Sequence, residues 1–371
     1  MSDQPQIALP AVYMRGGTSR ALFFHASDLP GSLDEREGWD AIFTAALGSP
    51  DPGERQLDGL GGGISSLSKV AIIAPSCRDD ADVDYLFGQV SVQGTTVSYR
   101  GNCGNISSAV GPFAIDEGLV AAAGDSAVIR IRNVNTDKLI YAHFALVGGK
   151  AAVRGDLAIQ GVAGTGAPVR LDFLDPGGAT TGRLLPTGQA TERLVVPGMA
   201  PIEVSLVDAA NPVVFARANA FGLRGDETPA ALSADRDLLD RLDTLRARAA
   251  VAMGLVSTLE DARLKVPNLP LVALLSCPEE EKADTRVRMI SAGQPHKATP
   301  LTGAMCLAVA ARMPGTLVAE MIRDVPERAI RIAHASGILP VDADIHDGVA
   351  RRVTVFRTAR RLMQGQILIP R

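Results

Sequence analysis

Two segments that are apolar on nearly every face constrain this chain most. Ile106–Asp116 and Gly303–Met313 leave no polar stripe for water, so each predicts a helix buried in a core. The sequence CGNISSAV from Cys103 can be laid over TGAMCLAV from Thr302: a small polar residue, a glycine and then a buried helix. At 371 residues the chain is longer than one core usually serves. We therefore predict an internal repeat of two similar lobes, residues 1–185 and 186–371.

Short apolar and β-branched runs predict strands around these helices. The turn-like, glycine-rich stretch Asp175–Gly188 lies between the two halves and sets the expected boundary near residue 185. Helices are expected at Trp39–Leu47 and, with an amphipathic pattern, at Asp235–Met253. Strands are expected at Ile7–Tyr13, Ala21–Phe24, Ser68–Ala74, Asp82–Gln89, Val90–Tyr99, Val128–Arg132, Leu139–Val147, Val169–Phe173, Ile202–Val207, Val213–Ala216, Val272–Leu275 and Val287–Ile290.

Composition argues against several classes of protein. The net charge is −4 and no long basic run exists, so nucleic-acid binding has little support. No apolar run approaches about 18 residues and the polar start does not resemble a signal peptide, so we expect a cytoplasmic protein that does not engage membranes. The cysteines, which form no CxxC pair, are expected as free thiols, and the histidines lack zinc-site spacing. The cysteines are Cys77, Cys103, Cys277 and Cys306.

The segment Gly101–Asn105 (GNCGN) places Cys103 and Gly104 at a predicted helix start. A helix N-terminus offers free N–H groups and a partial positive charge, which bind a carboxylate and lower a thiol pKa. Asn102 and Asn105 are candidates to cap the helix or to hold a substrate oxygen. A buried structural cysteine in a glycine turn is the alternative interpretation.

A glycine- and serine-rich loop, Gly61–Ser68, runs into the strand that begins at Lys69. Such a loop, with Ser65 and Ser66, can wrap an anion, but it matches neither GxxxxGK[ST] nor GxGxxG. A buried Lys69 would have a lowered pKa suited to a general base. The alternative is an edge lysine that reaches solvent.

Two further segments carry polar groups beside predicted turns. Met14–Arg20 combines a glycine turn with the hydroxyls of Thr18 and Ser19, and Arg15 or Arg20 offers a guanidinium fork for a carboxylate; an ordinary β-turn is the alternative. In the second half, His296 precedes Thr302 and Gly303 at the second helix start, where it would contact a carboxylate or shuttle a proton. A lone histidine is more often structural.

Taken in order, several segments resemble the 2-methylaconitate cis–trans isomerase family over nearly the whole chain. They are Met14–Ser19, Gly48–Asp51, Asp58–Gly62, Leu67–Val70, Asp82–Phe87, Asn102–Asn105 with Val110–Ala114, Leu185–Gly188 and Pro314–Leu317. The resemblance implies an α+β fold similar to diaminopimelate epimerase, with two lobes, each a curled, mostly antiparallel sheet around a central helix, and a site in the cleft between them. It implies that Lys69 and Cys103 are catalytic and that Thr18 and Ser19 bind substrate.

The implied reaction is the isomerisation of a small unsaturated di- or tricarboxylate, such as methylaconitate, aconitate, methylitaconate or oxalomesaconate. Removing a proton beside a conjugated C=C gives a dienolate, and reprotonation yields a cis–trans isomer or a shifted double bond. Lys69 is the candidate base and Cys103 the candidate acid or partner base, with the assignment left open. The chemistry requires no metal or organic cofactor.

Departures from the family pattern leave rivals open. Arg20 stands where the family commonly has lysine, and His334 is followed by Ala335 rather than proline. Thr302 occupies the position where amino-acid epimerases of this fold place a second catalytic cysteine, which disfavours a two-thiol racemase. The rivals are an amino-acid racemase and a non-catalytic accessory protein to a dehydratase. The oligomeric state is open, with a homodimer as the ordinary arrangement.

Overall fold

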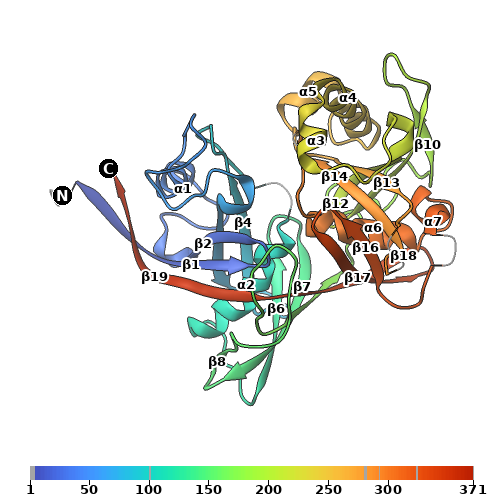
Figure 1. The fold of residues 1–371 in the computed structure, drawn as a ribbon. Helices are drawn as coiled ribbons and strands as arrows, with labels where there is room; N and C mark the ends of the chain where they lie inside the picture. The colour runs from blue at the N-terminus through green and yellow to red at the C-terminus, as the bar shows by residue number, and fades with distance from the viewer. Residues whose placement is uncertain (1–4, 100–101, 280–281, 292, 323–324, 371) are drawn as a thin grey trace. The chain divides into compact units, whose positions relative to one another are not determined.

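The computed structural model describes residues 5–99, 102–279, 282–291, 293–322 and 325–370. The chain forms two compact units (Figure 1). Unit 1 comprises Met1–Asp172 with Phe356–Arg371, and unit 2 comprises Phe173–Val355. The first residue of the GNCGN segment, Gly101, lies outside the described residues.

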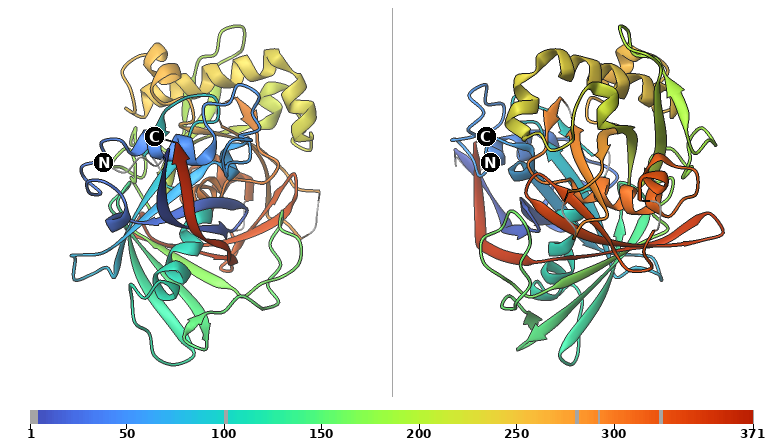
Figure 2. Two further views of the ribbon diagram at one scale, coloured as in Figure 1. Left: turned by 90° about the vertical axis from the view of Figure 1, so that its left-hand side faces the viewer. Right: turned by 45° about the vertical axis from the view of Figure 1, so that its right-hand side comes forward.

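The division differs from the expected one because the C-terminal strand returns to unit 1. Strand β19 (Ala359–Pro370) pairs antiparallel with β1 (Gln6–Gly16) along its length, so the two lie side by side in Figures 1 and 2. Ile369 packs with Ala11 in the core of unit 1. The residues Phe356–Arg371 therefore belong to unit 1 and not to the second unit. The other boundary lies between Asp172 and Phe173 rather than near residue 185.

Unit 1 is a mostly antiparallel sheet with α1 (Trp39–Leu47) on one face and α2 (Gly104–Asp116) on the other. β1 and β2 pair antiparallel, β2 and β3 parallel, and β3 and β4 antiparallel. Short 3-10 turns occupy Ala26–Asp28 and Ser65–Leu67. The remaining strands of this unit are β2 (Ser19–His25), β3 (Lys69–Pro75), β4 (Val83–Val90), β5 (Val97–Ser98), β6 (Ser126–Asn133), β7 (Lys138–Val147), β8 (Lys150–Ala151) and β9 (Val169–Leu174), which reaches the boundary.

Side-chain alternation along the strands separates the two faces of this sheet. Phe24 stacks on Phe43 of α1 at 5.4 Å between ring centres, whereas its neighbour Phe23 lies 5.4 Å from Phe113 of α2. Within α2, every residue except Asn105 and Asp116 is buried, which explains its lack of a polar stripe.

Unit 2 repeats the order antiparallel, parallel, antiparallel in β11, β12, β13 and β14. Helix α6 (Leu301–Ala311) is buried throughout, and α4 (Arg236–Ala252) packs through Leu238, Leu242 and Leu245 into a separate cluster. The predicted two-lobe repeat is therefore present. The other elements are β10 (Glu192–Leu194), β11 (Ile202–Ala209), β12 (Asn211–Arg217), 3-10 turn Ala218–Phe221, α3 (Pro229–Ala234), α5 (Leu259–Leu264), β13 (Leu271–Ser276), β14 (Thr285–Ser291), β15 (Gln294–Pro295), α7 (Leu317–Ile322), β16 (Ile330–His334), β17 (Gly337–His346) and β18 (Val349–Arg357).

One expected strand is much shorter than predicted. Of Val90–Tyr99, only Val90, at the end of β4, and Val97–Ser98 (β5) are extended, and β5 pairs antiparallel with β4. The amide of Gly94 donates to Ser91 Oγ at 2.9 Å and the amide of Ser91 donates to Thr96 O, which closes a tight loop. Across the described ranges, no helix has the length and apolar character needed to cross a membrane.

Candidate active site

Lys69 is the first residue of β3 and lies on the face of the sheet that carries α2. Val70 packs on the α1 side, so alternation turns Lys69 and Ala71 to the other side. Only 7% of Lys69 is exposed, and β3 is flanked by β2 and β4. The alternative of a solvent-reaching edge lysine is therefore wrong.

The Lys69 ammonium has two neighbours on β4. Its Nζ donates to Gln89 Oε1 and lies 5.1 Å from the centre of the Phe87 ring. Gln89 is held by its own Nε2, which donates to the carbonyls of Ser68 (2.9 Å) and Ser65 (3.1 Å). Because carbonyl oxygens only accept hydrogen bonds, these two bonds fix the Gln89 nitrogen toward the backbone and its oxygen toward Lys69.

Burial lowers the pKa of Lys69 because the charged ammonium is removed from water. A negative charge on Cys103 would oppose this shift and raise the pKa of Lys69 in part, which places the two groups within electrostatic range of one another. The structure thus brings together the two residues that the sequence singled out.

Cys103 is the N-cap residue of α2 and is half-buried. Its carbonyl accepts from the amide and the hydroxyl of Ser107, at 3.0 and 3.1 Å. No side chain in the described parts of the chain caps this helix start, so the expected capping by Asn102 or Asn105 is wrong. The first-turn amides next to Cys103 are therefore left without a side-chain acceptor among the described residues, as an anion-binding helix start would require.

Buried polar groups surround Cys103. Asn133, fully buried, donates to Asn102 Oδ1 at 3.0 Å, and its own Oδ1 accepts from the Thr136 amide at 3.1 Å. Tyr85 is also buried, and its hydroxyl makes no hydrogen bond of ordinary geometry within the described residues. Its pKa is raised well above the usual value, first by burial and then by negative charge on Cys103.

Sequence reasoning missed Tyr85, Gln89 and Asn133. Tyr85, Phe87 and Gln89 alternate along β4 and so share the face that Lys69 occupies. That i, i+2, i+4 spacing is the signal that was available. Asn133 carried no comparable signal.

The turn after β1 is tied to the C-terminal segment of unit 1. Arg15 Nη1 donates to the carbonyls of Gly17 and Thr358, both at 2.9 Å, so its fork is occupied within the protein. Thr18 Oγ1 accepts from Asn105 Nδ2 at 3.2 Å. Arg20 instead lies 5.5 Å from the Tyr13 ring centre, among residues of the α1 face.

The glycine-rich loop is organised around buried Gln56 rather than around an open cradle. The amide of Gly63 and the hydroxyl of Ser68 donate to Gln56 Oε1, at 2.9 and 2.7 Å, and the amide of Gly61 donates to Leu47 O. These donors are not available to wrap an anion, which corrects the expectation. Ser65 is exposed and Ser66 half-exposed, so their hydroxyls remain accessible.

The candidate residues of unit 2 cluster at the start of α6. Thr302 Oγ1 accepts from Asn211 Nδ2 at 2.9 Å, and Gly303 packs against Met289 and Leu271. His296 is half-buried and its amide donates to Met289 O at 2.8 Å. Cys306 is core, as expected: burial raises its pKa, and its thiol donates to Val207 O.

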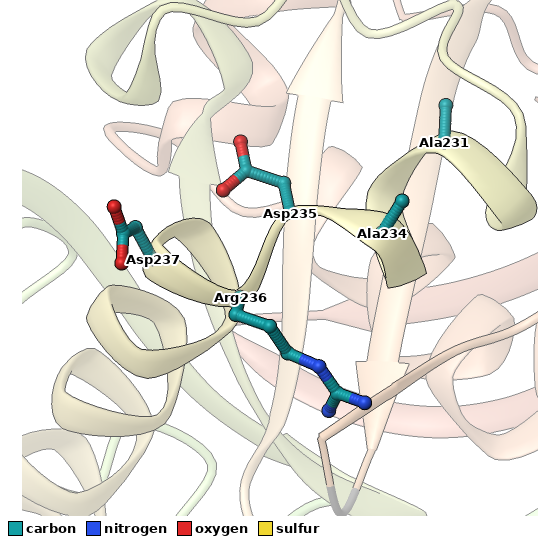
Figure 3. Close-up of a pocket in the computed structure, with 5 residues that line it drawn as sticks. All are labelled: Ala231, Ala234, Asp235, Arg236 and Asp237. Carbon is teal, nitrogen blue, oxygen red and sulfur yellow. The ribbon is translucent and has the colours of Figure 1, made fainter.

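A pocket away from these residues lies at the junction of α3 and α4 in unit 2, lined by Ala231, Ala234, Asp235, Arg236 and Asp237 (Figure 3). Asp235 caps α4 through its carboxylate, which accepts from the Leu238 amide at 2.9 Å. The lining offers no lysine, cysteine or histidine, so it does not suit proton transfer. No cluster of metal-ligating side chains occurs in the ranges that the structure covers.

The fold first defines a class. A hydroxyproline epimerase from Agrobacterium vitis shares the architecture at a TM-score of 0.59, with 11% identity over 100% of this chain and 95% of that chain. At that identity the likeness concerns the fold alone, and it confirms the predicted epimerase-like α+β class.

The chain itself belongs to the PrpF protein family, whose sequence profile matches residues 6–370. A 3-methylitaconate isomerase from Eubacterium barkeri is 41% identical over 100% of this chain and 98% of its own. A 2-methyl-aconitate isomerase from Cupriavidus necator is 36% identical, over 100% and 99%. The crystal structure of a methylitaconate-delta-isomerase superposes at a TM-score of 0.84, with 40% identity over 99% and 97%. The resemblance drawn from the sequence is confirmed, and the chain is an isomerase.

Proposed function

We propose that this protein isomerises a small unsaturated di- or tricarboxylate by proton abstraction and return. The observation that carries the proposal is the buried Lys69, whose pKa is lowered, interacting with Cys103 at the N-terminus of α2. The names of its relatives, which act on methylitaconate and 2-methyl-aconitate, support the substrate class.

Lys69 is the base in this proposal, because burial favours its neutral amine. The amine takes a proton from the carbon beside the double bond, the C–H electrons enter the conjugated system, and a dienolate and an ammonium result. Rotation followed by return of a proton from the Lys69 ammonium, whose hydrogens exchange with water, gives the cis–trans isomer. Alternatively, the Cys103 thiol gives a proton to the distal carbon, which shifts the double bond, and the Lys69 ammonium then reprotonates the thiolate.

Charge that develops on the substrate carboxylate must be stabilised in the transition state. The first-turn amides of α2, including that of Gly104, are oriented donors that need no reorganisation. Removing water from around Lys69 strengthens such interactions. The lowered base pKa and the positive helix end therefore act on the same intermediate.

Further residues are proposed to bind the substrate's carboxylates. In unit 1 they are Thr18, Ser19, Ser65, Ser66, Asn102, Gly104 and Asn105, and in unit 2 they are His296, Thr302 and Gly303. Arg20 is left out because its side chain lies on the α1 face of the sheet, opposite the face of Lys69. Thr18 and Asn105 have the best support, since they touch one another at the start of α2. We also propose a cytoplasmic homodimer that uses no metal or organic cofactor.

Proton NMR in deuterated water tests the proposal. Cis- and trans-aconitate, 2-methylaconitate, 3-methylitaconate and oxalomesaconate are offered in turn, and we expect enzyme-dependent deuterium uptake with a new isomer from at least one. Free proline, hydroxyproline and diaminopimelate serve as rival substrates. Exchange at the Cα of an amino acid, with none in the polycarboxylates, would replace this proposal by a racemase; no exchange anywhere would favour an accessory protein.

A further inference from the structure

Arg357, the last residue of β18, is a buried cation to which the proposed chemistry assigns no role. Its exposure is 7%, and burial lowers its pKa to about 10, so it remains charged at neutral pH. Within the part of the chain that the structure describes, Arg357 has no carboxylate partner. Burying a charge without a counter-ion destabilises the folded protein unless hydrogen bonds compensate for the lost water.

The contacts of Arg357 give a fixed direction to a chain of hydrogen bonds. Arg357 Nε donates to Asn105 Oδ1 at 3.1 Å, and Nη1 donates to the Phe356 carbonyl at 2.8 Å. A guanidinium has no acceptor, so the oxygen of the Asn105 amide must face it. The Asn105 nitrogen therefore faces Thr18 Oγ1, at 3.2 Å, and donates to it.

The direction of these hydrogen bonds determines how the Thr18 hydroxyl can act. A hydroxyl carries one hydrogen, and when its oxygen is occupied as an acceptor from Asn105, that hydrogen is left to donate. No described residue accepts it. A carboxylate only accepts hydrogen bonds, so a Thr18 hydroxyl with its hydrogen free matches one side of a carboxylate substrate.

The Asn105 side chain is closely packed against the turn after β1, so it has little room to change its conformation. A Cβ on Gly17, whose φ is +53°, would lie 2.1 Å from Asn105 Oδ1, and one on Gly16 would lie 2.5 Å from the Asn105 carbonyl. The residue after Arg357 holds the same turn, because the Gly17 amide donates to Thr358 O at 2.9 Å. Arg357 and Thr358 thus brace both ends of the Asn105–Thr18 bond.

We infer that Arg357 is a positioning residue that, through Asn105, orients the Thr18 hydroxyl as a donor to a substrate carboxylate. Arg357 itself does not touch the substrate. The inference rests on the proposed function, because it takes Thr18 to be a substrate contact.

The test measures KM and kcat in single and double variants, for the polycarboxylate that the wild-type protein isomerises fastest in the NMR assay. Thr18→Val and Arg357→Met should each raise KM, by about 10-fold for a hydrogen bond to a charged group, with kcat changed less than about 3-fold. If Arg357 acts through Thr18, the double variant should have the KM of Thr18→Val alone. Multiplying effects in the double variant would overturn the inference.

Matched variants separate direction from stability. Arg357→Lys keeps a donor and should restore much of the KM even if Arg357→Met folds poorly. Asn105→Asp strengthens the pair with Arg357 but offers oxygen to Thr18, so it should raise KM although a purely structural role predicts tolerance. Arg312→Met removes another guanidinium that binds backbone carbonyls, in unit 2, and should leave KM unchanged. Raised KM in Thr18→Val with unchanged KM in Arg357→Met overturns the relay alone, whereas unchanged KM in Thr18→Val also counts against the proposed function.

Discussion

The two units share one plan but differ at the positions where chemistry is expected. In unit 1, β3 begins at Lys69, and α2 follows Cys103 and begins at Gly104. In unit 2, β13 begins at Leu271, and α6 begins at Leu301, followed by Thr302. A Cβ on Gly303 would lie 3.0 Å from Leu271 Cδ1, so the start of α6 meets an apolar side chain rather than an amine. The repeated framework thus has a central helix N-terminus in each unit, and the one in unit 1 is accompanied by the buried lysine and the cysteine.

A polar link between turn and helix is retained in both units. Asn105 of α2 donates to Thr18 of the β1–β2 turn, and Asn211 of β12 donates to Thr302 of α6, with the roles of helix and turn exchanged. Under the proposed function, proton transfer is assigned to unit 1, and Thr302 of unit 2 is one of the proposed substrate contacts.

The largest effect is expected from Lys69→Met. Isomerisation should fall by about 10³-fold or more, as expected when a general base is lost. Unfolded Lys69 keeps its proton to about pH 10.5, whereas the buried group loses it earlier, so at neutral pH the charged form is destabilised by burial. Methionine removes that penalty, and the melting temperature should therefore not fall.

Lys265→Met is the matched control for that variant. Lys265 is an exposed lysine of unit 2 paired with Asp261, and its loss should leave activity unchanged. Near-native turnover by Lys69→Met, measured by NMR, would contradict the claim that unit 1 holds the general base.

The two central helices each carry a cysteine, and serine substitutions should separate them. Cys103→Ser should lower activity by about 10²-fold with the fold intact, and more for a double-bond shift than for rotation, because the shift needs a second donor. Cys306→Ser should instead lower the melting temperature, since Cys306 is fully buried, while activity per folded molecule persists. Equal activity losses would contradict the assignment.

Gln89→Glu should shift the pH profile. A carboxylate beside Lys69 would stabilise the ammonium and raise its pKa, so the neutral amine would form only at higher pH. We expect kcat/KM at pH 7 to fall by about 10-fold and to recover as pH rises. Gln364→Glu, at an exposed amide paired with Arg361, is the control; an unshifted profile in Gln89→Glu would count against Lys69 as the base.

The smallest effect concerns unit 2. Thr302→Val should raise KM by about 2- to 10-fold, the range for one neutral hydrogen bond, and leave kcat nearly constant. Thr244→Val, on the exposed side of α4, should change neither. A fall in kcat comparable to that of Cys103→Ser would place proton transfer in unit 2 as well.

Most helices and strands could be predicted because they depend on the local pattern of apolar and polar residues. All-round apolar sequence predicted α2 and α6, and short apolar and β-branched runs predicted most strands. The pairing of β1 with β19 could not be predicted, since it joins the two ends of the chain, and it moved the domain boundary. Lys69 and Cys103 stood out as unusual residues in apolar or glycine-rich surroundings.

The partners of these residues were harder to predict. Gln89 and Arg357 matter through the direction of their hydrogen bonds, and direction depends on register between distant segments. The local sequence of the glycine-rich loop led to the wrong prediction of an anion-binding loop. The Gly63 amide instead donates to Gln56, which lies seven residues earlier in the chain, outside the loop.

The most direct test of the account is the pKa of Lys69 itself. The protein is labelled with ¹³C at lysine Cε and titrated by NMR, and Lys69→Met assigns the resonance. The account predicts one lysine that titrates below the ordinary value of 10.5, is absent from Lys69→Met, and follows the same pKa as the rise of kcat/KM with pH. A Lys69 resonance that titrates at or above 10.5 would contradict the claim that unit 1 holds a buried amine as its base.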